Sequence, residues 1–422
     1  MPLHEMNRVS LICGVALSLL VGCAPPPKTV LRVPLYPYIP DAAGDKLSAM
    51  AARIETEFER AHPDVDLVLN PSCFTDDFYE PAQIARSLKG EGECNYDVIE
   101  TDTAILGELV AEGGVRPWPR LPKNIEWHSS GLLASTHAEQ NAVYGVPHWL
   151  CGHFVMSRDE SVRQARTTSA LVQALEARHT AVPDMAFNML GSWNLPSLYL
   201  DGWVDAHGLE GVRSAVTTSS YDSEVLQSLR AFASTCDASG GNPCLDGTYD
   251  LEENADLPAK LFAENKADAT AGYSERLHVI LKSLPAGESP SAIKISSAPL
   301  AEGSRPILFT DSYFLGVRCT GECEQAALDF VQYMSQASTF EWLLMSEDAP
   351  EGTRVPRYLL PAALDVYKAP RLRADPFYPT LEEETRNGGP FPNSGLYGIR
   401  KQMRDSIQEE LIRSDESHTT NR

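Results

Sequence analysis

The spacing of hydrophobic residues near the start of the chain follows the periods of a strand, a helix and a second strand. Residues 30–35 and 65–69 are strand-like, and the second run alternates apolar and polar positions. Between them, residues 45–61 carry apolar side chains on one helical face: Leu47, Met50, Ile54 and Phe58. A strand, a helix and a strand in this order predict an α/β sheet.

Three later strand-like runs cover residues 96–102, 144–156 and 307–317, and the first of them ends at Asp102. Ligands in open α/β sheets bind outside the carboxyl ends of strands, so Asp102 lies where a ligand is expected. Residues 265–275 follow a helix with a small-residue strand and a Gly-Tyr pair, a pattern similar to that of periplasmic solute-binding proteins. Helices are expected at about 82–89, 103–112, 160–180, 226–233, 257–264, 323–345 and 396–412.

The N-terminus has the pattern of an export signal. Arg8 precedes an apolar run from Val9 to Val21, which suits a signal peptide but is too short to span a bilayer as a helix. The run leads into Leu-Val-Gly-Cys, which resembles a bacterial lipobox whose cysteine, Cys23, becomes lipidated. We predict a lipoprotein-type signal peptide at 1–22 and a Pro-rich spacer at 23–29. The alternative is an ordinary cleaved signal with a chance cysteine.

This prediction makes the protein exported and anchored by lipid alone to a bacterial membrane, facing the periplasm or the exterior. No later apolar run is long enough for a transmembrane helix. The formal net charge of −23 argues against nucleic acid as the main partner, because phosphate binding needs a basic surface. Hydrophobic residues make up 43% of the chain, enough for a sizeable core.

Cysteine spacing singles out one thiol. In an exported protein disulfides persist, and the cysteines in polar loops can be paired there. A metal site is weakly supported, since no histidine lies near Cys236 and Cys244 or near Cys319 and Cys323. With Cys13 and Cys23 set aside, three pairs are plausible and leave Cys151 alone in an apolar run: Cys73 with Cys94, Cys236 with Cys244, and Cys319 with Cys323.

Cys151 has two interpretations. A buried free cysteine is common and usually inert. A spare thiol beside several disulfides risks wrong pairing, however, and neighbouring positive charge can lower a cysteine pKa. His148 and His153 flank Cys151, but two-residue alternation puts only His153 on its face of a regular strand. The sequence therefore does not favour a cysteine–histidine pair.

Three carboxylates lie in apolar or aromatic runs: Asp102, Glu275 and Asp311. A buried carboxylate costs free energy unless a partner satisfies it, so these three could converge on a polar ligand. The alternatives are a surface or salt-bridged carboxylate for Glu275 and a capped turn or core hydrogen bond for the others. Aromatic residues near the same segments suit a cleft that stacks a flat ligand, with core packing as the alternative: Tyr36, Tyr38, Phe74, Tyr79, Tyr273, Phe309 and Tyr313.

Over residues 30–412 the chain resembles bacterial thiaminase I (thiamine pyridinylase), of the periplasmic-binding-protein-like superfamily. No single motif is specific for this family, but the order in which the motifs follow one another is. The resemblance is carried by Leu35-Tyr36-Pro37-Tyr38-Ile39-Pro40-Asp41, Tyr96-Asp97-Val98-Ile99-Glu100-Thr101-Asp102-Thr103, Tyr144-Gly145-Val146-Pro147 leading to Leu150-Cys151, Gly272-Tyr273-Ser274-Glu275, Phe309-Thr310-Asp311 and Arg357-Tyr358-Leu359-Leu360-Pro361.

The resemblance implies a transferase that exchanges the base of thiamine without a metal or organic cofactor. Cys151 matches the nucleophile that attacks the pyrimidine ring at the carbon bearing the methylene bridge. Glu275 matches the general base, which deprotonates the cysteine and later the incoming amine or thiol. Asp102 and Asp311 match carboxylates that hydrogen-bond the ring nitrogen and amino group of the pyrimidine.

The resemblance also implies pocket aromatics. Tyr273 matches one pocket tyrosine, and Tyr36 or Tyr38 another. Phe309 departs from the family pattern, because a tyrosine is expected there, and one hydroxyl is therefore missing from the pocket. The lipobox is also unlike a freely secreted enzyme. The expected partners are thiamine and a small amine or thiol nucleophile, with the protein a monomer.

The fold expected from these observations is a two-lobed α/β protein of the periplasmic-binding-protein-like type II, with a cleft between the lobes. Lobe 1 is predicted at 30–142 with a return segment at about 305–345, and lobe 2 at 143–304 with about 346–412. A polar tail, expected to be disordered, follows at 413–422.

Two rival functions remain open. A lipid-anchored binding protein for thiamine or a related pyrimidine needs the aromatics and carboxylates but not Cys151 with Glu275. A lipoprotein that binds an unrelated solute, such as a sugar or peptide, leaves Cys151 buried and inert.

Overall fold

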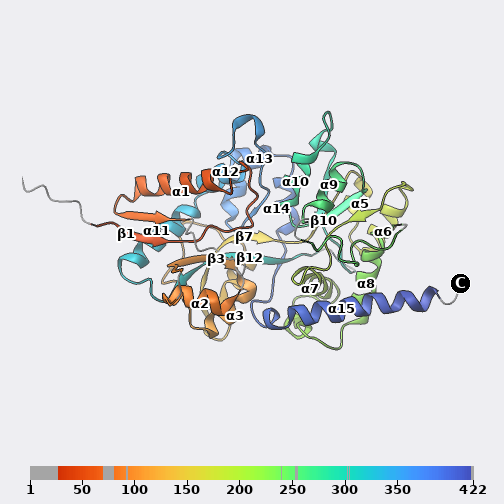
Figure 1. Ribbon diagram of the computed structural model, residues 1–422, viewed down its shortest axis with the longest axis horizontal. Coiled ribbons are helices and arrows are strands. Elements are labelled where there is room, and N and C mark those ends of the chain that lie inside the picture. Colours follow the sequence, from red (N-terminus) through yellow and green to blue (C-terminus); the bar gives the residue numbers. More distant parts are fainter. Residues whose placement is uncertain are drawn as a thin grey trace, which may run out of the picture.

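The protein has a two-lobed α/β fold, seen in a computed structural model that describes residues 27–69, 80–91, 94–238, 240–251, 255–301, 303 and 305–419, with side chains to residue 413. One lobe is built around α1, α2, α3 and α11 and the other around α6, α7, α8 and α15 (Figure 1). The predicted fold class is therefore confirmed. The residue boundaries predicted for the lobes remain a prediction.

The chain begins with the predicted strand, helix and strand. β1 (Thr29–Arg32) pairs in parallel with β2 (Val65–Val68), and Leu31 lies opposite Leu67. α1 (Ser48–Ala61) connects them and buries its apolar face through Met50, Ile54 and Phe58. The helical period of these apolar positions is what allows the helix to cover the strand pair.

The central sheet is organised around one long strand. β12 (Ile307–Gly316) is buried at every residue and runs through the middle of the molecule (Figure 1). The sheet order is β13 (Leu360–Pro361), β7 (Gly145–Cys151), β12 and β14 (Gly389–Pro390). β3 (Val98–Asp102) and β4 (Val115–Arg116) also pair with β12.

A second sheet of four strands lies in the other lobe. Its order is β11 (Lys294–Ser297), β8 (Phe154–Ser157), β10 (Ala269–Gly272) and β9 (Met185–Ala186). The run 144–156, predicted as one strand, is thus two strands in two sheets. Gly152 and His153 form the break, which carries the chain from the central sheet into the second lobe.

The predicted helices are present, three of them with a clear difference in extent, and the helices at 129–134, 194–207, 276–283, 370–374 and 378–385 were not predicted. They are α2 (Pro81–Lys89), α3 (Leu106–Ala111), α4 (Ser129–Ala134), α5 (Glu160–Gln164), α6 (Thr168–Glu176), α7 (Asn194–His207), α8 (Ser223–Ser234), α9 (Leu257–Ala263), α10 (Arg276–Ser283), α11 (Glu322–Met334), α12 (Ala337–Leu344), α13 (Pro370–Ala374), α14 (Tyr378–Thr385) and α15 (Leu396–Thr419). A small hairpin, β5 (Thr136–His137) and β6 (Ala142–Val143), completes the described elements.

Each difference has a local cause. The helix predicted at 160–180 is broken because Thr167 is an N-cap whose side chain accepts the Ala170 backbone N–H at 3.1 Å and so starts α6 anew. The helix predicted at 323–345 is two helices, with Gln336 in an extended conformation before α12. α15 continues past residue 412, where a disordered tail was expected, and Arg413 pairs with Glu409 one turn earlier.

Two predicted disulfides are confirmed, Cys236–Cys244 and Cys319–Cys323. Cys94 is also disulfide-bonded, but Cys73, its predicted partner, lies outside the described residues. Among the described cysteines Cys151 is free, as its apolar context predicted.

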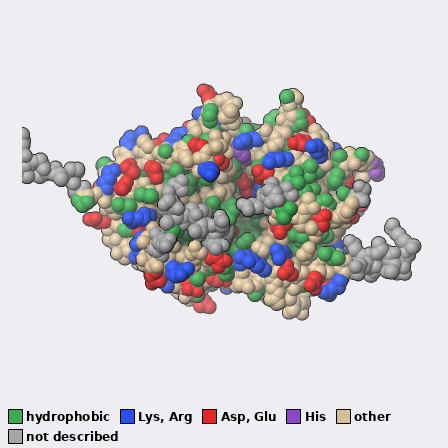
Figure 2. Space-filling model, viewed as in Figure 1, with side chains coloured by type: hydrophobic (Ala, Val, Ile, Leu, Met, Phe, Trp, Pro, Cys, Tyr) green, Lys and Arg blue, Asp and Glu red, His purple; other side chains and the backbone are tan. Residues whose placement is uncertain are grey.

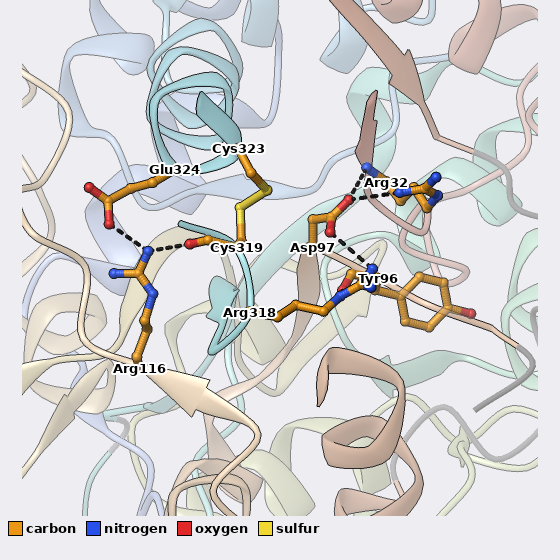
Figure 3. The surroundings of a disulfide bond; sticks show 8 residues. All are labelled: Arg32, Tyr96, Asp97, Arg116, Arg318, Cys319, Cys323 and Glu324. Atoms are coloured by element: carbon orange, nitrogen blue, oxygen red, sulfur yellow. Dashed lines mark hydrogen bonds and ion pairs between the residues drawn. A yellow bond between two sulfur atoms is a disulfide. The ribbon is translucent and has the colours of Figure 1, made fainter. Parts of the chain in front are cut away.

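Hydrogen bonds and an ion pair fix the far end of β12 beside the second disulfide (Figure 3). Arg116 donates to the backbone oxygen of Cys319. Arg318 donates to Asp97 Oδ1 at 3.1 Å, and Asp97 Oδ2 accepts the Arg32 backbone N–H at 2.9 Å. The end of the strand that carries Asp311 is thereby tied to β1 and to the segment before β3.

No helix within the described part of the chain is long and apolar enough to cross a membrane. The predicted signal peptide and Cys23 lie outside the described residues, as do Phe74 and Tyr79. Lipid anchoring therefore remains a prediction.

Candidate active site

A cavity of about 1030 Å³ receives lining residues from both lobes. All eight residues predicted for catalysis or substrate binding line it: Tyr36, Tyr38, Asp102, Cys151, Tyr273, Glu275, Phe309 and Asp311. They come from segments that are far apart in the sequence, so their convergence is a property of the fold. On the face shown in Figure 2, acidic and basic side chains are interspersed, and neither sign forms one broad patch.

Strand register brings four of these residues onto one face of the central sheet. Phe309 lies opposite Cys151 in the antiparallel pair of β12 and β7, and Asp311 lies opposite Asp102 in the pair of β12 and β3. Phe309 and Asp311 are two residues apart and so share a face of β12. A register shift follows Asp311, between it and Ser312, where the ladder with β7 is irregular. Cys151 and Asp311 thus reach the cavity from neighbouring strands.

Asp311 is the centre of the polar contacts. Its Oδ1 accepts the Tyr36 hydroxyl at 2.7 Å, and its Oδ2 lies 3.8 Å from the Cys151 sulfur. Burial, followed by the nearby charge of Asp102, raises the pKa of Asp311 well above its ordinary value, while the Tyr36 hydrogen bond lowers it. Two facing carboxyls in one buried site cannot both ionise easily, so this pair is suited to a ligand that carries hydrogen-bond donors or positive charge.

Asp102 ends β3 and also caps the following turn. Its Oδ1 accepts the Ala104 backbone N–H at 2.7 Å, which fixes the carboxyl at the cavity wall. Burial raises the pKa of Asp102 to about 7, and the hydrogen bond from Ala104 lowers it in part. This carboxyl therefore changes its charge near neutral pH.

The Cys151 thiol faces the cavity at the end of β7 and is half-buried. Burial raises its pKa well above the ordinary value, and the negative charges of Asp311, Glu275 and Asp102 raise it further. The sulfur is therefore protonated at neutral pH. A nucleophilic role needs a neighbouring base or a positive ligand charge to release the proton.

Glu275 lies immediately before α10 and lines the same cavity. Burial raises its pKa, and the adjacent Arg276 guanidinium lowers it in part. Arg276 itself is held by Asp256 at 2.9 Å. A carboxylate with a raised pKa, close enough to act electrostatically on Cys151, has the properties of a general base.

The aromatic residues form two groups around these polar atoms. Tyr36 and Tyr38 meet edge to face with their ring centroids 5.5 Å apart, and Tyr38 is 53% exposed. Tyr273 and Phe309 meet edge to face at 6.1 Å, and Phe309 stacks on Phe391 at 3.8 Å. Tyr313, which the sequence grouped with them, is buried, and a side-chain hydrogen bond joins it to Glu100.

The histidines beside Cys151 have other partners. His148 Nδ1 bonds Glu100, and His153 Nδ1 bonds Asp201 at 3.0 Å. Because the chain breaks at Gly152, the alternation that would put His153 beside Cys151 on one strand does not apply. The sequence was therefore right not to favour a cysteine–histidine pair.

Sequence reasoning missed several residues that line the cavity. Trp193 and Asn194 lie at the start of α7. Arg400 lies near the end of the chain, and no local pattern in the sequence marks it as a cavity residue. α15 carries its guanidinium over the ring of Trp193, with the guanidinium carbon 4.9 Å from the ring centroid. The other polar residues that line the cavity are Asp41, Glu80, Asp256, Lys260, Arg276, His278, Lys282 and Ser283. Within the described ranges, no group of three His, Cys, Asp or Glu side chains is arranged to hold a metal ion.

Comparison with known proteins finds the fold among solved structures. No family model matches the sequence, and no curated protein does. Thiaminase I from Bacillus thiaminolyticus is 21% identical, with a TM-score of 0.68 over 90% of this chain and 99% of that one. Clostridium botulinum thiaminase I in complex with thiamin is 20% identical, with a TM-score of 0.70 over 90% and 99%.

Solute-binding proteins share the fold as well. The maltose-bound MalE3 of T. maritima is 14% identical, with a TM-score of 0.62 over 91% of this chain and 99% of that one. At these identities the likeness shows the two-lobed fold and no more.

Proposed function

We propose that this protein is a thiamine base-exchange transferase of the thiaminase I type. The observation that carries the proposal is the meeting of Cys151 and Glu275 in one cavity with the carboxyls of Asp102 and Asp311. The fold likeness to two thiaminase I structures, one of them in complex with thiamin, supports the same reading.

In the first half of the reaction, Glu275 takes the proton of Cys151. The thiolate bonds to a carbon of the pyrimidine ring, and the electron pair it supplies moves through the ring towards the bridge. The bond between the bridge methylene and the thiazolium nitrogen breaks, and its electron pair stays on nitrogen. The thiazole therefore leaves as a neutral molecule and needs no proton.

In the second half, an amine or thiol bonds to the bridge methylene and loses its proton to the site. The carbon–sulfur bond breaks and returns its electron pair to Cys151. Glu275 holds the Cys151 proton after the first half and returns it to the departing sulfur in the second, and the carboxylate so freed takes the proton of the nucleophile and passes it to solvent. The overall exchange releases one proton.

The remaining cavity residues bind and orient the substrate. Asp102 and Asp311 accept or share hydrogen bonds with the ring nitrogen and amino group of the pyrimidine. The positive thiazolium favours the ionised form of these carboxyls, and it also favours the Cys151 thiolate. Tyr36, Tyr38, Tyr273 and Phe309 provide aromatic faces against which flat rings pack.

A lipid-anchored binding protein for thiamine or a related pyrimidine is the second candidate, because solute-binding proteins share the fold. Such a protein uses the carboxyls and aromatics but has no need of a free thiol beside a buried glutamate. Product formation therefore distinguishes the transferase from a protein that only binds thiamine.

The test is incubation of the purified protein with thiamine and an aromatic amine, followed by product analysis by mass spectrometry. The proposal expects free thiazole and a pyrimidine–amine product with the native protein and neither with Cys151→Ser. Tight thiamine binding without thiazole at any amine concentration would establish the binding protein instead.

A further inference from the structure

The motif at residues 357–361 carries part of the family resemblance but has no part in the proposed chemistry. It follows α12 and ends in β13, and every one of its residues is buried. Leu360 pairs with Leu150, which directly precedes Cys151 in β7. We call residues 356–361 the connecting segment. One end of this segment is therefore fixed to the strand that carries the thiol.

Two side chains at the start of α10 hydrogen-bond the other end of the connecting segment. Ser274 Oγ donates to the Tyr358 backbone oxygen at 2.6 Å, and this bond is buried. His278 Nδ1 lies 3.1 Å from the Pro356 backbone oxygen, which can only accept, so the imidazole donates. Ser274 directly precedes Glu275, and His278 follows it by three residues. The backbone of Glu275 is therefore held from both sides.

The Arg357 side chain ties the connecting segment to α12 and to the loop before α1. Its guanidinium is fully buried and donates to Asp348 through Nη1 at 2.8 Å and through Nη2 at 2.6 Å. Nη1 also donates to the Leu343 backbone oxygen at 2.6 Å, and Nε donates to the Pro40 backbone oxygen at 2.9 Å. Pro40 lines the cavity together with Tyr38. A buried guanidinium that is bonded at all three nitrogens fixes the segment relative to this wall.

The backbone of Tyr358 has a conformation that its surroundings must maintain. Its φ of 54° lies in the left-handed region, which is uncommon for a residue other than glycine. Its hydroxyl donates to Asp375 Oδ2 at 3.2 Å, and its ring packs against Phe377 and Tyr378 with centroid distances of 5.4 and 5.3 Å. Strained residues persist where such contacts fix them, and they cluster at functional sites. The carbonyl that accepts the Ser274 hydroxyl is therefore held in one orientation.

The Glu275 carboxylate needs such a support because it lies in a field of like charge. Burial raises the pKa of the Cys151 thiol, and three carboxylates raise it further: Asp311 on β12, Glu275 before α10 and Asp102 on β3. The same repulsion acts on Glu275 and favours its movement away from the sulfur. A base that moves away cannot take the thiol proton, since proton transfer needs hydrogen-bond reach.

We propose that Ser274 and His278 are positioning residues that hold Glu275 beside Cys151. Both bind the connecting segment, which is paired through β13 with the strand of Cys151 and anchored by Arg357. The base and the nucleophile are thus fixed against the same six residues. The inference rests on the proposed function only for the role of Glu275 as the base, because its placement beside the thiol can be measured without thiamine.

The rate of Cys151 alkylation by iodoacetamide at pH 8, with peptide mapping, measures that placement, because the thiolate is the reactive form. Glu275→Gln removes the carboxylate charge and is expected to raise the rate about fivefold. Ser274→Ala lets the carboxylate move away and is expected to raise it about twofold. The double variant is expected to react at the Glu275→Gln rate, because Ser274 acts through Glu275. A Ser274→Ala rate that does not rise, or that rises equally in both backgrounds, would overturn the proposal.

Ser335→Ala is the matched control, because Ser335 is a buried serine whose hydroxyl donates to the Val331 backbone oxygen at 2.7 Å at the end of α11. It is expected to leave the alkylation rate unchanged. His278→Ala removes the second donor without removing a charge, since burial lowers the pKa of this imidazole and leaves it neutral at pH 8. It is expected to act like Ser274→Ala, and it decides the same cycle if Ser274→Ala does not fold.

The consequence for the reaction is a loss of rate without a loss of binding. Ser274→Ala is expected to slow single-turnover thiazole release about tenfold and to leave the Kd of thiamine, measured in the Cys151→Ser background, within about twofold. A rise in Kd as large as the loss of rate would show that Ser274 supports the cavity as a whole, and would contradict the proposal. If the native protein releases no thiazole, the proposed function fails, and the alkylation cycle alone decides this inference.

Discussion

At the scale of single residues, burial and nearby negative charge hold the Cys151 thiol in its protonated form. The pKa of the thiol is raised by burial first and by three carboxyls after it. Under the proposed function the positive charge of the substrate opposes that electrostatic effect, and we expect the thiolate to form when the substrate is bound. A protonated thiol also resists oxidation, since the thiolate is the reactive form.

Glu275→Gln tests the base. The amide keeps the size of the side chain but cannot take a proton, so single-turnover thiazole release is expected to slow by about 10²–10⁴-fold. Binding of thiamine in the Cys151→Ser background should change much less. A Glu275→Gln protein that releases thiazole at the native rate would exclude Glu275 as the base.

Asp102 links the site to stability. Its pKa is about 7 in the folded protein against an ordinary 3.8, so between these values the folded state holds more protons than the unfolded state. The stability contributed by its protonated form is complete below pH 3.8 and is lost as the pH rises through 7. Asp102→Asn is therefore expected to raise the Tm at pH 8 by about 2–5 °C and to leave it nearly unchanged at pH 4.

Asp365 provides a control of opposite sign. Its pKa is lowered, mainly by the hydrogen bond from Lys368, so Asp365→Asn should not stabilise the protein at pH 8. A Tm difference between Asp102→Asn and the native protein that does not vary with pH would contradict the raised pKa.

At the scale of elements, β12 shows what a sequence can predict. Its residues are all buried, and a run of this kind is recognisable as a strand without knowledge of its neighbours. No local sequence pattern predicts the order of the strands around β12. The pairing of Asp311 with Asp102 depends on which segments meet in the folded chain.

The break after Cys151 shows where a local pattern fails. Residues 144–156 are apolar on both sides of Gly152, so alternation gives no sign that one strand ends there. The break becomes visible only in three dimensions, where a side chain on Gly152 would come within 3.0 Å of Leu308 Cδ2. That close approach to β12 lets the chain leave one sheet and enter the other.

Gly145→Ala tests the packing of β7 on β12. The added Cβ would lie 2.7 Å from Ser312 Cβ and 3.1 Å from Ser135 Cβ, so the strands must move apart. The free energy of unfolding is expected to fall by about 1–3 kcal/mol, measured by urea denaturation. Gly398→Ala is the control, since a Cβ there meets nothing within 4 Å and a helical alanine adds about 0.5–1 kcal/mol. Equal effects of the two would argue against tight packing at Gly145.

At the scale of the whole molecule, the cavity joins residues that the sequence separates by more than three hundred positions. Physical reasoning named all eight candidate residues, Cys151 as a spare thiol and the three carboxylates and four aromatics as possible ligand contacts, and they line one cavity. The resemblance to a known family added the role of each residue. Physical reasoning could not reach Arg400, because a cation on a polar helix has no feature in the sequence that sets it apart.

The net charge of −23 leads to a prediction about salt. A cationic substrate is attracted by the acidic protein and by its cavity carboxyls, and salt screens that attraction. kcat/KM for thiamine is expected to fall about threefold between roughly 50 and 500 mM salt. The KM for a neutral amine nucleophile, measured in the same series, should stay constant. An unchanged kcat/KM for thiamine would show that charge does not assist binding.

The central claim is that Cys151 forms a covalent bond to the pyrimidine of thiamine. The most direct measurement is intact-protein mass spectrometry after mixing with thiamine in the absence of an amine, followed by peptide mapping. We expect a mass increase equal to the pyrimidine moiety without the thiazole, located on Cys151, which disappears when an aromatic amine is added. Thiazole release with no adduct on Cys151, or an adduct on any other residue, would contradict it.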